Sequence, residues 1–177
     1  MVKPNIILTG FMATGKTTVG KLLADQLGYE FVDTDELIVA RSGQSVAEIF
    51  REKGEAVFRE MEAAVASELG DKQGLVIATG GRLMLNQANV AALSMRGRVF
   101  CLVATPDEIL ARVSKDRQVK RPLLEAADPM QRIIELMRER HQDYSHFSRI
   151  VTSGKTPEEV MQELIVFFQS SPADNSS

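Results

Sequence analysis

The sequence contains a single cysteine, Cys101, and no tryptophan among its 177 residues. One cysteine excludes an intramolecular disulfide, so the chain suits a reducing compartment. Cys101 lies in the apolar run VFCLVA, where a small buried side chain is the expected role. The two histidines, His141 and His146, have no Cys or His partner at the spacing of metal ligands, and we assign them no metal chemistry.

The chain also has little net charge and no long hydrophobic run. Its net charge is −3 and its pI about 5.5, which gives no general electrostatic reason to bind nucleic acid or an anionic membrane. No window approaches the roughly 20 apolar residues of a membrane span, and the first apolar run is too short for a signal peptide. We therefore expect a cytoplasmic protein without nucleic-acid or membrane partners. We also expect a monomer, although no feature of the sequence decides the oligomeric state.

What the chain does have is an alternation of short apolar strands with amphipathic helices. The strands are predicted at 5–10, 30–35, 74–79, 98–104 and 149–153, and the helices at 17–28, 45–54, 55–70, 105–113, 128–147 and 156–169. This order predicts a three-layer α/β/α fold with a five-stranded parallel sheet. We expect one domain over residues 1–169, a mobile loop over the cation-rich segment 114–125, and a disordered polar tail at 170–177.

A glycine-rich segment joins the first predicted strand to the first predicted helix. Residues 10–18, GFMATGKTT, match the phosphate-loop pattern G-x-x-x-x-G-K-[ST]. In this context backbone N–H groups point at an anion, Lys16 reaches the β- and γ-phosphates, and Thr17 offers a hydroxyl to Mg²⁺. A glycine turn that merely caps a helix is the alternative, which the strand–loop–helix order disfavours. The nucleotide contacts are expected at Met12, Ala13, Thr14, Gly15, Lys16, Thr17 and Thr18.

Two aspartates, Asp33 and Asp35, stand two residues apart at the end of the second predicted strand. Strand geometry would put both side chains on one side if the strand continued that far. Ligands of parallel α/β sheets bind at the carboxyl ends of the strands, beside the phosphate loop. One carboxylate there can hold the water shell of a metal, while the other accepts a proton from an attacking hydroxyl. Asp35 could also be the N-cap of the helix that follows.

Three arginines have more than one interpretation in the sequence alone. Arg59 and Glu62 lie three residues apart on a predicted helix, and this spacing by itself indicates a surface ion pair. Arg140 lies in RERHQDY, which is typical of a solvated helix face. Arg121 lies in KRPLLE, within the polar segment 114–125. This position is the one expected of a lid arginine that closes on a transferring phosphoryl group.

With these residues in place, the chain resembles the shikimate kinases from the first strand to the terminal helix. Four signatures occur in order: the phosphate loop, DTD followed by SGQSVAEIFREKGEAVFREME, the glycine turn at 79–82, and the RPLL of the lid. The second signature is the most specific, because gluconate kinase shares the loop and the fold but not this run. The resemblance implies a P-loop kinase of the nucleoside monophosphate kinase type, with its substrate-binding region at about 33–62 and a lid at about 112–125.

The resemblance also implies a reaction and its nucleotide site. The reaction is Mg²⁺-dependent transfer of the γ-phosphoryl group of ATP to the 3-hydroxyl of shikimate, which gives shikimate 3-phosphate and ADP in aromatic amino acid biosynthesis. Lys16 and the loop would hold the ATP phosphates, Arg121 would close on them with the lid, and Arg112 would pack on adenine. Thr17, and Asp33 through water, would hold Mg²⁺.

The substrate site follows from the same resemblance. Asp35 would contact the reacting hydroxyl and act as the base, and Arg59 and Arg140 would grip the carboxylate. Gly80 and Gly81 would form the floor of the pocket, with Gly81 donating a backbone N–H. Two arginines for a carboxylate and one aspartate for a hydroxyl suit an acid that carries vicinal hydroxyls.

The chain departs from the family pattern after its third strand, where Arg82 follows Gly80 and Gly81 in place of a third glycine. Arg82 could turn outward to solvent, add an anion contact or change the shape of the pocket, and its role is left open, as is that of Glu62. The alternatives to a shikimate kinase are a kinase of a related polyhydroxylated acid and a nucleotide-binding relative without catalysis. A minor departure is Ala13-Thr14, where relatives often have Gly-Ser.

Overall fold

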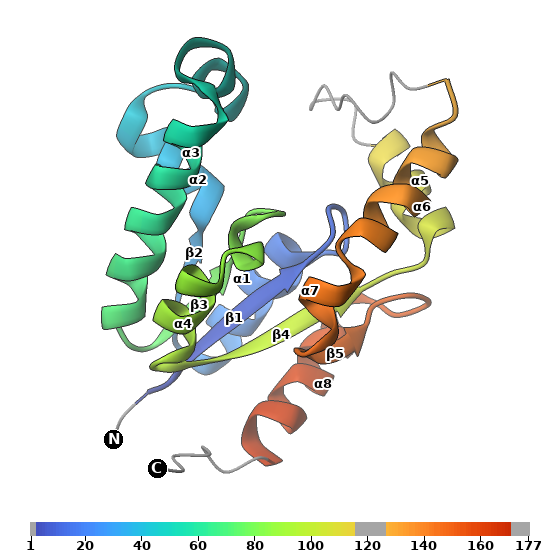
Figure 1. Cartoon of the computed structure of the whole chain (residues 1–177). Coiled ribbons are helices and arrows are strands. Elements are labelled where there is room, and N and C mark those ends of the chain that lie inside the picture. The colour runs from blue at the N-terminus through green and yellow to red at the C-terminus, as the bar shows by residue number, and fades with distance from the viewer. Residues whose placement is uncertain (1–2, 116–126, 171–177) are drawn as a thin grey trace.

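The computed structural model describes residues 3–115 and 127–170 and contains a five-stranded parallel sheet (Figure 1). The strand order is β2-β3-β1-β4-β5, and all neighbouring strands are parallel. The strands are β1 (Asn5–Gly10), β2 (Glu30–Asp33), β3 (Leu75–Ala78), β4 (Gly97–Val103) and β5 (Ser148–Val151). The predicted α/β fold class is confirmed.

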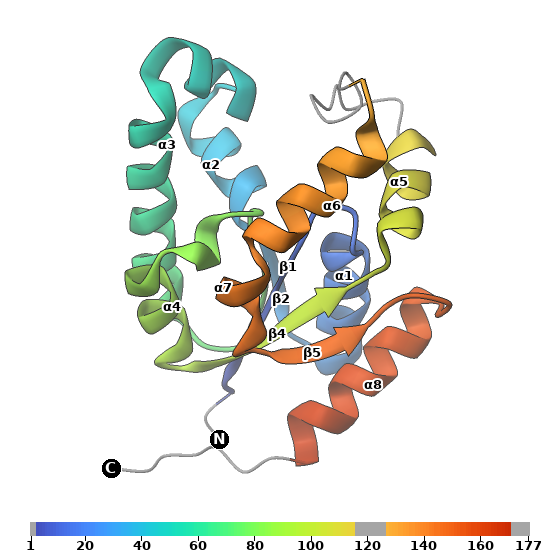
Figure 2. The same cartoon turned by 45° about the vertical axis from the view of Figure 1, so that its right-hand side comes forward.

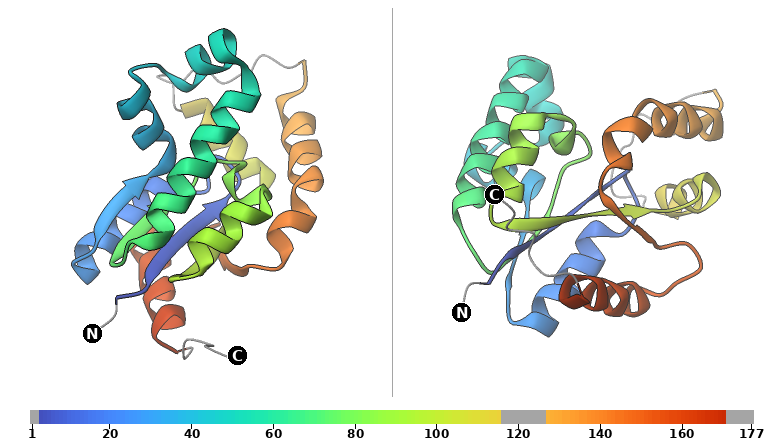
Figure 3. Two further views of the ribbon diagram at one scale, coloured as in Figure 1. Left: turned by 60° about the vertical axis from the view of Figure 1, so that its left-hand side comes forward. Right: turned by 60° about the horizontal axis from the view of Figure 1, so that its bottom comes forward.

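Successive residues of the central strand β1 supply the cores on the two faces of the sheet. Ile6 and Leu8 join the cluster formed with α1 (Lys16–Leu27) and α8 (Pro157–Ser170), whereas Ile7 joins the cluster formed with α3 (Val46–Asp71) and α4 (Gln87–Ser94). This period of two is the alternation that strand geometry imposes. Both faces of the sheet are therefore covered by helices, as the right-hand view of Figure 3 shows.

Two helical units extend beyond the carboxyl ends of the strands, on opposite sides (Figures 1 and 2). One consists of α2 (Thr34–Ser42) packed on α3, and the other of α5 (Pro106–Lys115) packed on α6 (Pro129–Glu139). The short helices η1 (Leu83–Leu85) and α7 (His141–Ser145) lie between them and contact each other. The phosphate loop thus lies at the base of the two helical units, α2–α3 and α5–α6, which come from different parts of the sequence.

Several local signals in the sequence predict their elements correctly. Ser45 and Glu48 form the predicted capping box, and Gly28 ends α1 in the left-handed conformation at φ 61°. At Gly54, φ is 87° and ψ is 168°, so the two helices predicted on either side of it run on as α3 with a kink at this glycine. Among the described residues, none of the helices is long and apolar enough to cross a membrane.

Two predicted boundaries are wrong. Strand β2 ends at Asp33, whose carboxylate accepts hydrogen bonds from the N–H groups of Asp35 (3.0 Å) and Glu36 (3.3 Å), so Asp33 is the N-cap of α2. Asp35 therefore lies in the first turn of that helix and neither continues the strand nor caps the helix. The predicted helix 128–147 is divided into α6 and α7, because the backbone departs from the helix at Arg140, with φ −96° and ψ −2°.

The predicted loop and tail fall largely outside the described residues. Ser114 and Lys115 belong to α5, so the predicted start of the loop at residue 114 is wrong. Residues 116–126, which include the predicted lid arginine Arg121, and residues 171–177 of the predicted tail are not among the described residues.

Candidate active site

The phosphate loop connects β1 to α1 in a conformation that depends on its glycines. Gly10 has φ 129°, and a Cβ at this position would lie 2.3 Å from the carbonyl oxygen of Leu102 in the neighbouring strand. Gly15 has φ 97° just before α1 begins. Ala13 has φ 57° and is, among the described residues, the one non-glycine residue with positive φ. The loop thus holds an alanine in the left-handed conformation, which favours glycine.

Lys16 lies at the first position of α1, and its ammonium folds back over the loop. The Nζ donates hydrogen bonds to the carbonyl oxygens of Gly10 (2.9 Å) and Phe11 (2.8 Å). Burial lowers the pKa of Lys16 to about 8, and the carboxylates of Asp33 and Asp35 oppose this shift. An anion placed at the loop would restore the missing counter-charge, which fits a phosphate-binding role.

Thr17 and Asp33 meet at the same end of α1. The Thr17 hydroxyl lies 3.1 Å from Oδ2 of Asp33, whose other oxygen caps α2. A hydroxyl beside a carboxylate is the all-oxygen donor set that Mg²⁺ takes when it keeps several waters and binds phosphate oxygens. The described residues hold no group of three His, Cys, Asp or Glu side chains that could bind a metal alone. The donor set therefore fits a metal held jointly with a nucleotide.

The carboxyl group of Asp35 is enclosed beside the glycine turn after β3. A Cβ at Gly80 would lie 2.4 Å from Oδ1 of Asp35, and the N–H of Gly80 is held by the buried hydroxyl of Thr34 at 2.9 Å. Oδ1 is buried and has no hydrogen-bond partner in the described part of the chain. Burial, followed by the charges of Asp33 and Glu62, raises the pKa of Asp35 to about 6. A buried acceptor without a donor marks a place for a ligand hydroxyl.

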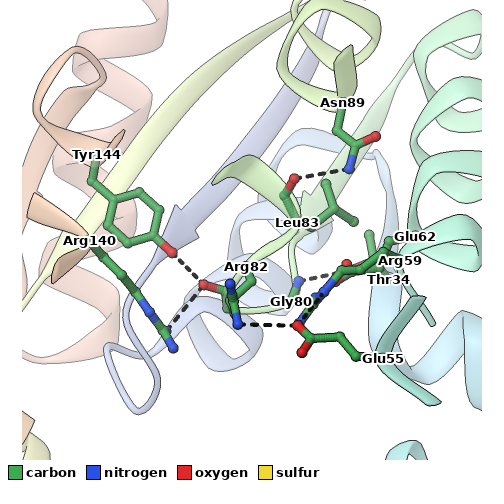
Figure 4. A network of polar contacts seen from close by, with 11 residues as sticks. Thr34, Glu55, Arg59, Glu62, Gly80, Arg82, Leu83, Asn89, Arg140 and Tyr144 are labelled. Carbon is green, nitrogen blue, oxygen red and sulfur yellow. Dashed lines mark hydrogen bonds and ion pairs between the residues drawn. The ribbon is translucent and has the colours of Figure 1, made fainter. Parts of the chain in front are cut away.

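Gly81 connects the turn to the other side of the site. Its carbonyl oxygen accepts hydrogen bonds from the Tyr144 hydroxyl at 2.6 Å and from Nη1 of Arg140 at 3.3 Å (Figure 4). The Arg140 guanidinium also lies 5.2 Å from the ring centroid of Phe11 in the phosphate loop. Arg140 is half-buried, and burial lowers its pKa, so the solvated helix face indicated by its sequence context is wrong.

Arg59 is fixed on α3 by carboxylates on two of its edges. Nη1 donates to Glu62 at 2.6 Å, while Nε (3.2 Å) and Nη2 (2.9 Å) donate to Oε1 of Glu55. The guanidinium lies over the rings of Phe50 and Phe58, at 5.7 and 5.4 Å from their centroids. The Glu62 side chain is only 2% exposed and that of Arg59 29%, so the Arg59–Glu62 contact is a partly buried ion pair and the surface pair indicated by spacing is wrong.

Arg112 reaches the phosphate loop from α5. Its Nη1 donates to the carbonyl oxygen of Ala13 at 3.0 Å and contacts the hydroxyl of Thr152, after β5, at 3.4 Å. Met12 packs with the apolar residues of α5 and α6, and Thr18 is exposed on α1. Apart from Arg121, all residues predicted for the site lie around the loop, the glycine turn or α3.

A model of the shikimate kinase family matches residues 12–169, which is most of the chain. The chain belongs to the shikimate kinase family. It is 46% identical over 162 residues to a shikimate kinase of Caldanaerobacter subterraneus subsp. tengcongensis, with 91% of this chain and 94% of the relative covered. It is 42% identical over 167 residues to a shikimate kinase of Alkaliphilus oremlandii, with 93% and 98% covered.

Solved structures agree with this assignment. The shikimate kinase from Acinetobacter baumannii in complex with shikimate superimposes with a TM-score of 0.86 and 35% identity, covering 97% of this chain and 96% of that one. Membership of the shikimate kinase family makes this protein an ATP-dependent small-molecule kinase, as the phosphate loop predicts.

The position that departs from the shikimate kinase pattern has a defined partner. The Arg82 side chain is 53% exposed, and its Nη1 lies 3.2 Å from Oε1 of Glu55. Arg82 thus does not extend freely into solvent, because it is paired with Glu55. Since Glu55 also accepts hydrogen bonds from Arg59, Arg82 lies beside the predicted substrate arginine. Of the three possibilities left open by the sequence, the structure shows a half-exposed arginine that is paired with Glu55 of α3.

Three residues of this shikimate kinase site escape prediction from the sequence: Thr34, Glu55 and Tyr144. Thr34 lies inside the DTD motif and Glu55 precedes Arg59 by four residues, a spacing that indicates an ion pair. Tyr144 has no local signal, because its partner, the Gly81 carbonyl, lies 63 residues away in sequence.

Proposed function

We propose that the protein transfers the γ-phosphoryl group of ATP to the 3-hydroxyl of shikimate, giving shikimate 3-phosphate and ADP. The observation that carries this proposal is the buried, unpartnered Oδ1 of Asp35, which lies against Gly80 at the end of the sheet that also bears the phosphate loop. A neutral hydroxyl donor is the group that this acceptor lacks. The shikimate complex of the Acinetobacter baumannii relative supports the choice of acceptor.

In the proposed reaction the 3-hydroxyl oxygen forms a bond to the γ-phosphorus of ATP. The bond between that phosphorus and the β–γ bridging oxygen breaks, and ADP leaves with this oxygen. The hydroxyl proton passes to the carboxylate of Asp35. The pKa of Asp35, about 6, leaves this carboxylate ionised at neutral pH, and it is near enough to neutral pH for the carboxylate to act as a base. Positioning and charge stabilisation supply most of the acceleration in such transfers.

The remaining residues would bind and orient the two substrates. Arg59 and Arg140 would bind the carboxylate of shikimate, and Gly81 would donate its backbone N–H. Fixed guanidinium groups suit this task, and Arg59 is fixed by Glu62 and two aromatic rings. Lys16 and the loop N–H groups would bind the ATP phosphates, Arg112 would contact adenine, and Arg121 would close on the phosphates from the lid.

Mg²⁺ would be held by the hydroxyl of Thr17, by Asp33 through water, and by phosphate oxygens. When bound, Mg²⁺ would neutralise charge on the β- and γ-phosphates. The 3.1 Å contact between Thr17 and Asp33 supports this position, because it brings the two oxygens to one point beside the loop.

A coupled assay of ADP release with and without shikimate tests the proposal. We expect shikimate-dependent turnover that requires Mg²⁺ and is abolished in Asp35→Asn, which keeps the shape of the side chain but cannot accept the proton. Related polyhydroxylated acids should be tested as alternative substrates in the same assay, and their kcat/KM compared with that of shikimate. Absence of shikimate-dependent turnover in a folded sample that binds ATP would contradict the proposal, and a higher kcat/KM for another acid would reassign the substrate.

A further inference from the structure

One oxygen of Glu55 is shared by two arginines from different parts of the chain. Oε1 accepts from Nε (3.2 Å) and Nη2 (2.9 Å) of Arg59 on α3, and from Nη1 (3.2 Å) of Arg82 in the turn after β3. Figure 4 shows the Glu55 carboxylate between the Arg82 side chain and the Arg59–Glu62 pair. Glu55 thus links α3 to the glycine turn after β3, across 27 residues of sequence.

Glu55 occupies the edge of Arg59 that a carboxylate ligand would use. The Nε–Nη2 edge of a guanidinium offers two parallel N–H groups, which match the two oxygens of a carboxylate. The Nη1 side of Arg59 is taken by Glu62, which is buried and cannot move away without leaving its charge unpaired. A substrate carboxylate that uses the paired Nε–H and Nη2–H groups of Arg59 must therefore displace Glu55.

The environment of Glu55 allows this displacement. Its side chain is 51% exposed and follows Gly54, where the backbone of α3 leaves the helical conformation. The hydrogen bonds and the charge of Arg59, and to a smaller extent the charge of Arg82, lower the pKa of Glu55. Glu55 is therefore an anion that a neighbouring cation can attract when it leaves Arg59. Arg82, at 3.2 Å and 53% exposed, is already in contact and free to follow the carboxylate.

We propose that Arg82 is a positioning residue that retains Glu55 when the substrate carboxylate takes its place on Arg59. This inference rests on the proposed function, since it assumes a carboxylate substrate bound by Arg59. Arg82 would act through Glu55 and not by touching the substrate. Its effect should therefore fall on the KM for shikimate, while kcat, which depends on the reacting hydroxyl and Asp35, should change little.

The first test is Arg82→Ala in the full-length protein. Exposed ion pairs are worth little, so we expect the KM for shikimate to rise about threefold, with kcat and the KM for ATP within a factor of about two. Arg82→Lys keeps the charge and should recover part of the loss. Arg41→Ala is the matched control, because Arg41 is a similarly exposed arginine (47%) paired with Glu68 on α3, and its loss should leave the shikimate KM unchanged.

The decisive test is a double-mutant cycle with Glu55→Gln, which removes the charge that competes for Arg59. We expect Glu55→Gln to leave the shikimate KM unchanged or lower, and Arg82→Ala to have no further effect in the Glu55→Gln background. An equal rise in KM in both backgrounds would mean that Arg82 binds the substrate carboxylate directly, and would overturn the inference. An unchanged or lowered KM in Arg82→Ala alone would overturn it as well.

The proposed function and the proposed role of Arg82 can be contradicted separately. If the unmodified protein shows no shikimate-dependent turnover, the proposed function is wrong and this inference falls with it. If turnover is normal but the cycle is additive, only the role of Arg82 is wrong. Thermal unfolding of each variant, expected within a few degrees of the unmodified protein, excludes a general loss of folded enzyme as the cause of a changed KM.

Discussion

Gly80 and Asp35 are packed so closely that the glycine has no room for a side chain: a Cβ at position 80 would lie 2.4 Å from Oδ1 of Asp35. The Asp35 side chain is short and enclosed, so it cannot swing aside without leaving its position in the site. Asp35, the proposed base, can therefore keep its position only if residue 80 is a glycine. This role of the glycine turn is additional to its proposed role as the floor of the pocket.

Gly80→Ala should lower kcat by about 100-fold, because displacing a catalytic group by about 1 Å has an effect of this size. Gly81→Ala is the matched comparison for kcat alone, because Gly81 lies in the proposed substrate site but a Cβ there would lie 3.5 Å from Nη1 of Arg140, an ordinary contact. Steady-state kinetics of both variants measure the difference. Equal losses in the two variants would show that the Asp35 contact is not the cause.

The activity should have an acidic limb set by Asp35. Burial raises the pKa of Asp35 to about 6, so the ionised form that accepts a proton is present above this pH and is lost as the pH falls through it. We expect kcat/KM for shikimate to fall about tenfold per pH unit below pH 6. A profile that stays flat down to pH 4.5 would remove Asp35 from the role of base.

ATP binding should weaken in alkaline solution. Burial lowers the pKa of Lys16 to about 8 in the ligand-free protein, and bound phosphates favour the charged form, so each binding event above pH 8 must also take up a proton. The Kd for ATP, measured by calorimetry, should rise about tenfold between pH 7 and pH 9. Lys16→Gln should bind ATP more weakly, and its Kd for ATP should no longer depend on pH in this range. A pH dependence that persists in Lys16→Gln would mean that another group titrates.

Tyr144→Phe should destabilise the turn that carries Gly81. The hydroxyl of Tyr144 donates a 2.6 Å hydrogen bond to the Gly81 carbonyl, and the loss of such a bond costs about 1 kcal/mol. We expect the free energy of unfolding in urea to fall by this amount and the KM for shikimate to rise. Tyr29→Phe, at the other tyrosine of the chain, should change the free energy of unfolding by less than about 0.5 kcal/mol.

The parts of the site predicted from the sequence are those that local rules govern. The phosphate loop can be predicted because glycines, a lysine and a hydroxyl follow a buried strand at fixed spacing. The capping box at Ser45 and Glu48 likewise depends on residues three apart. The helix break at Arg140 could not be predicted, because residues 128–147 keep a helical pattern. There the arginine contacts Phe11 and Gly81, which are remote in sequence.

The alternation of strands and helices, the phosphate loop and the family can all be predicted from the sequence, because each depends on short-range pattern and spacing. The strand order β2-β3-β1-β4-β5, which brings α3 beside the turn after β3, follows from long-range packing and is known only from the folded structure. That packing enclosed Asp35 against Gly80 and placed Arg82 on Glu55. Such contacts form between side chains of elements that are distant in sequence. The carboxylate partner of a long, exposed arginine therefore cannot be predicted from local spacing.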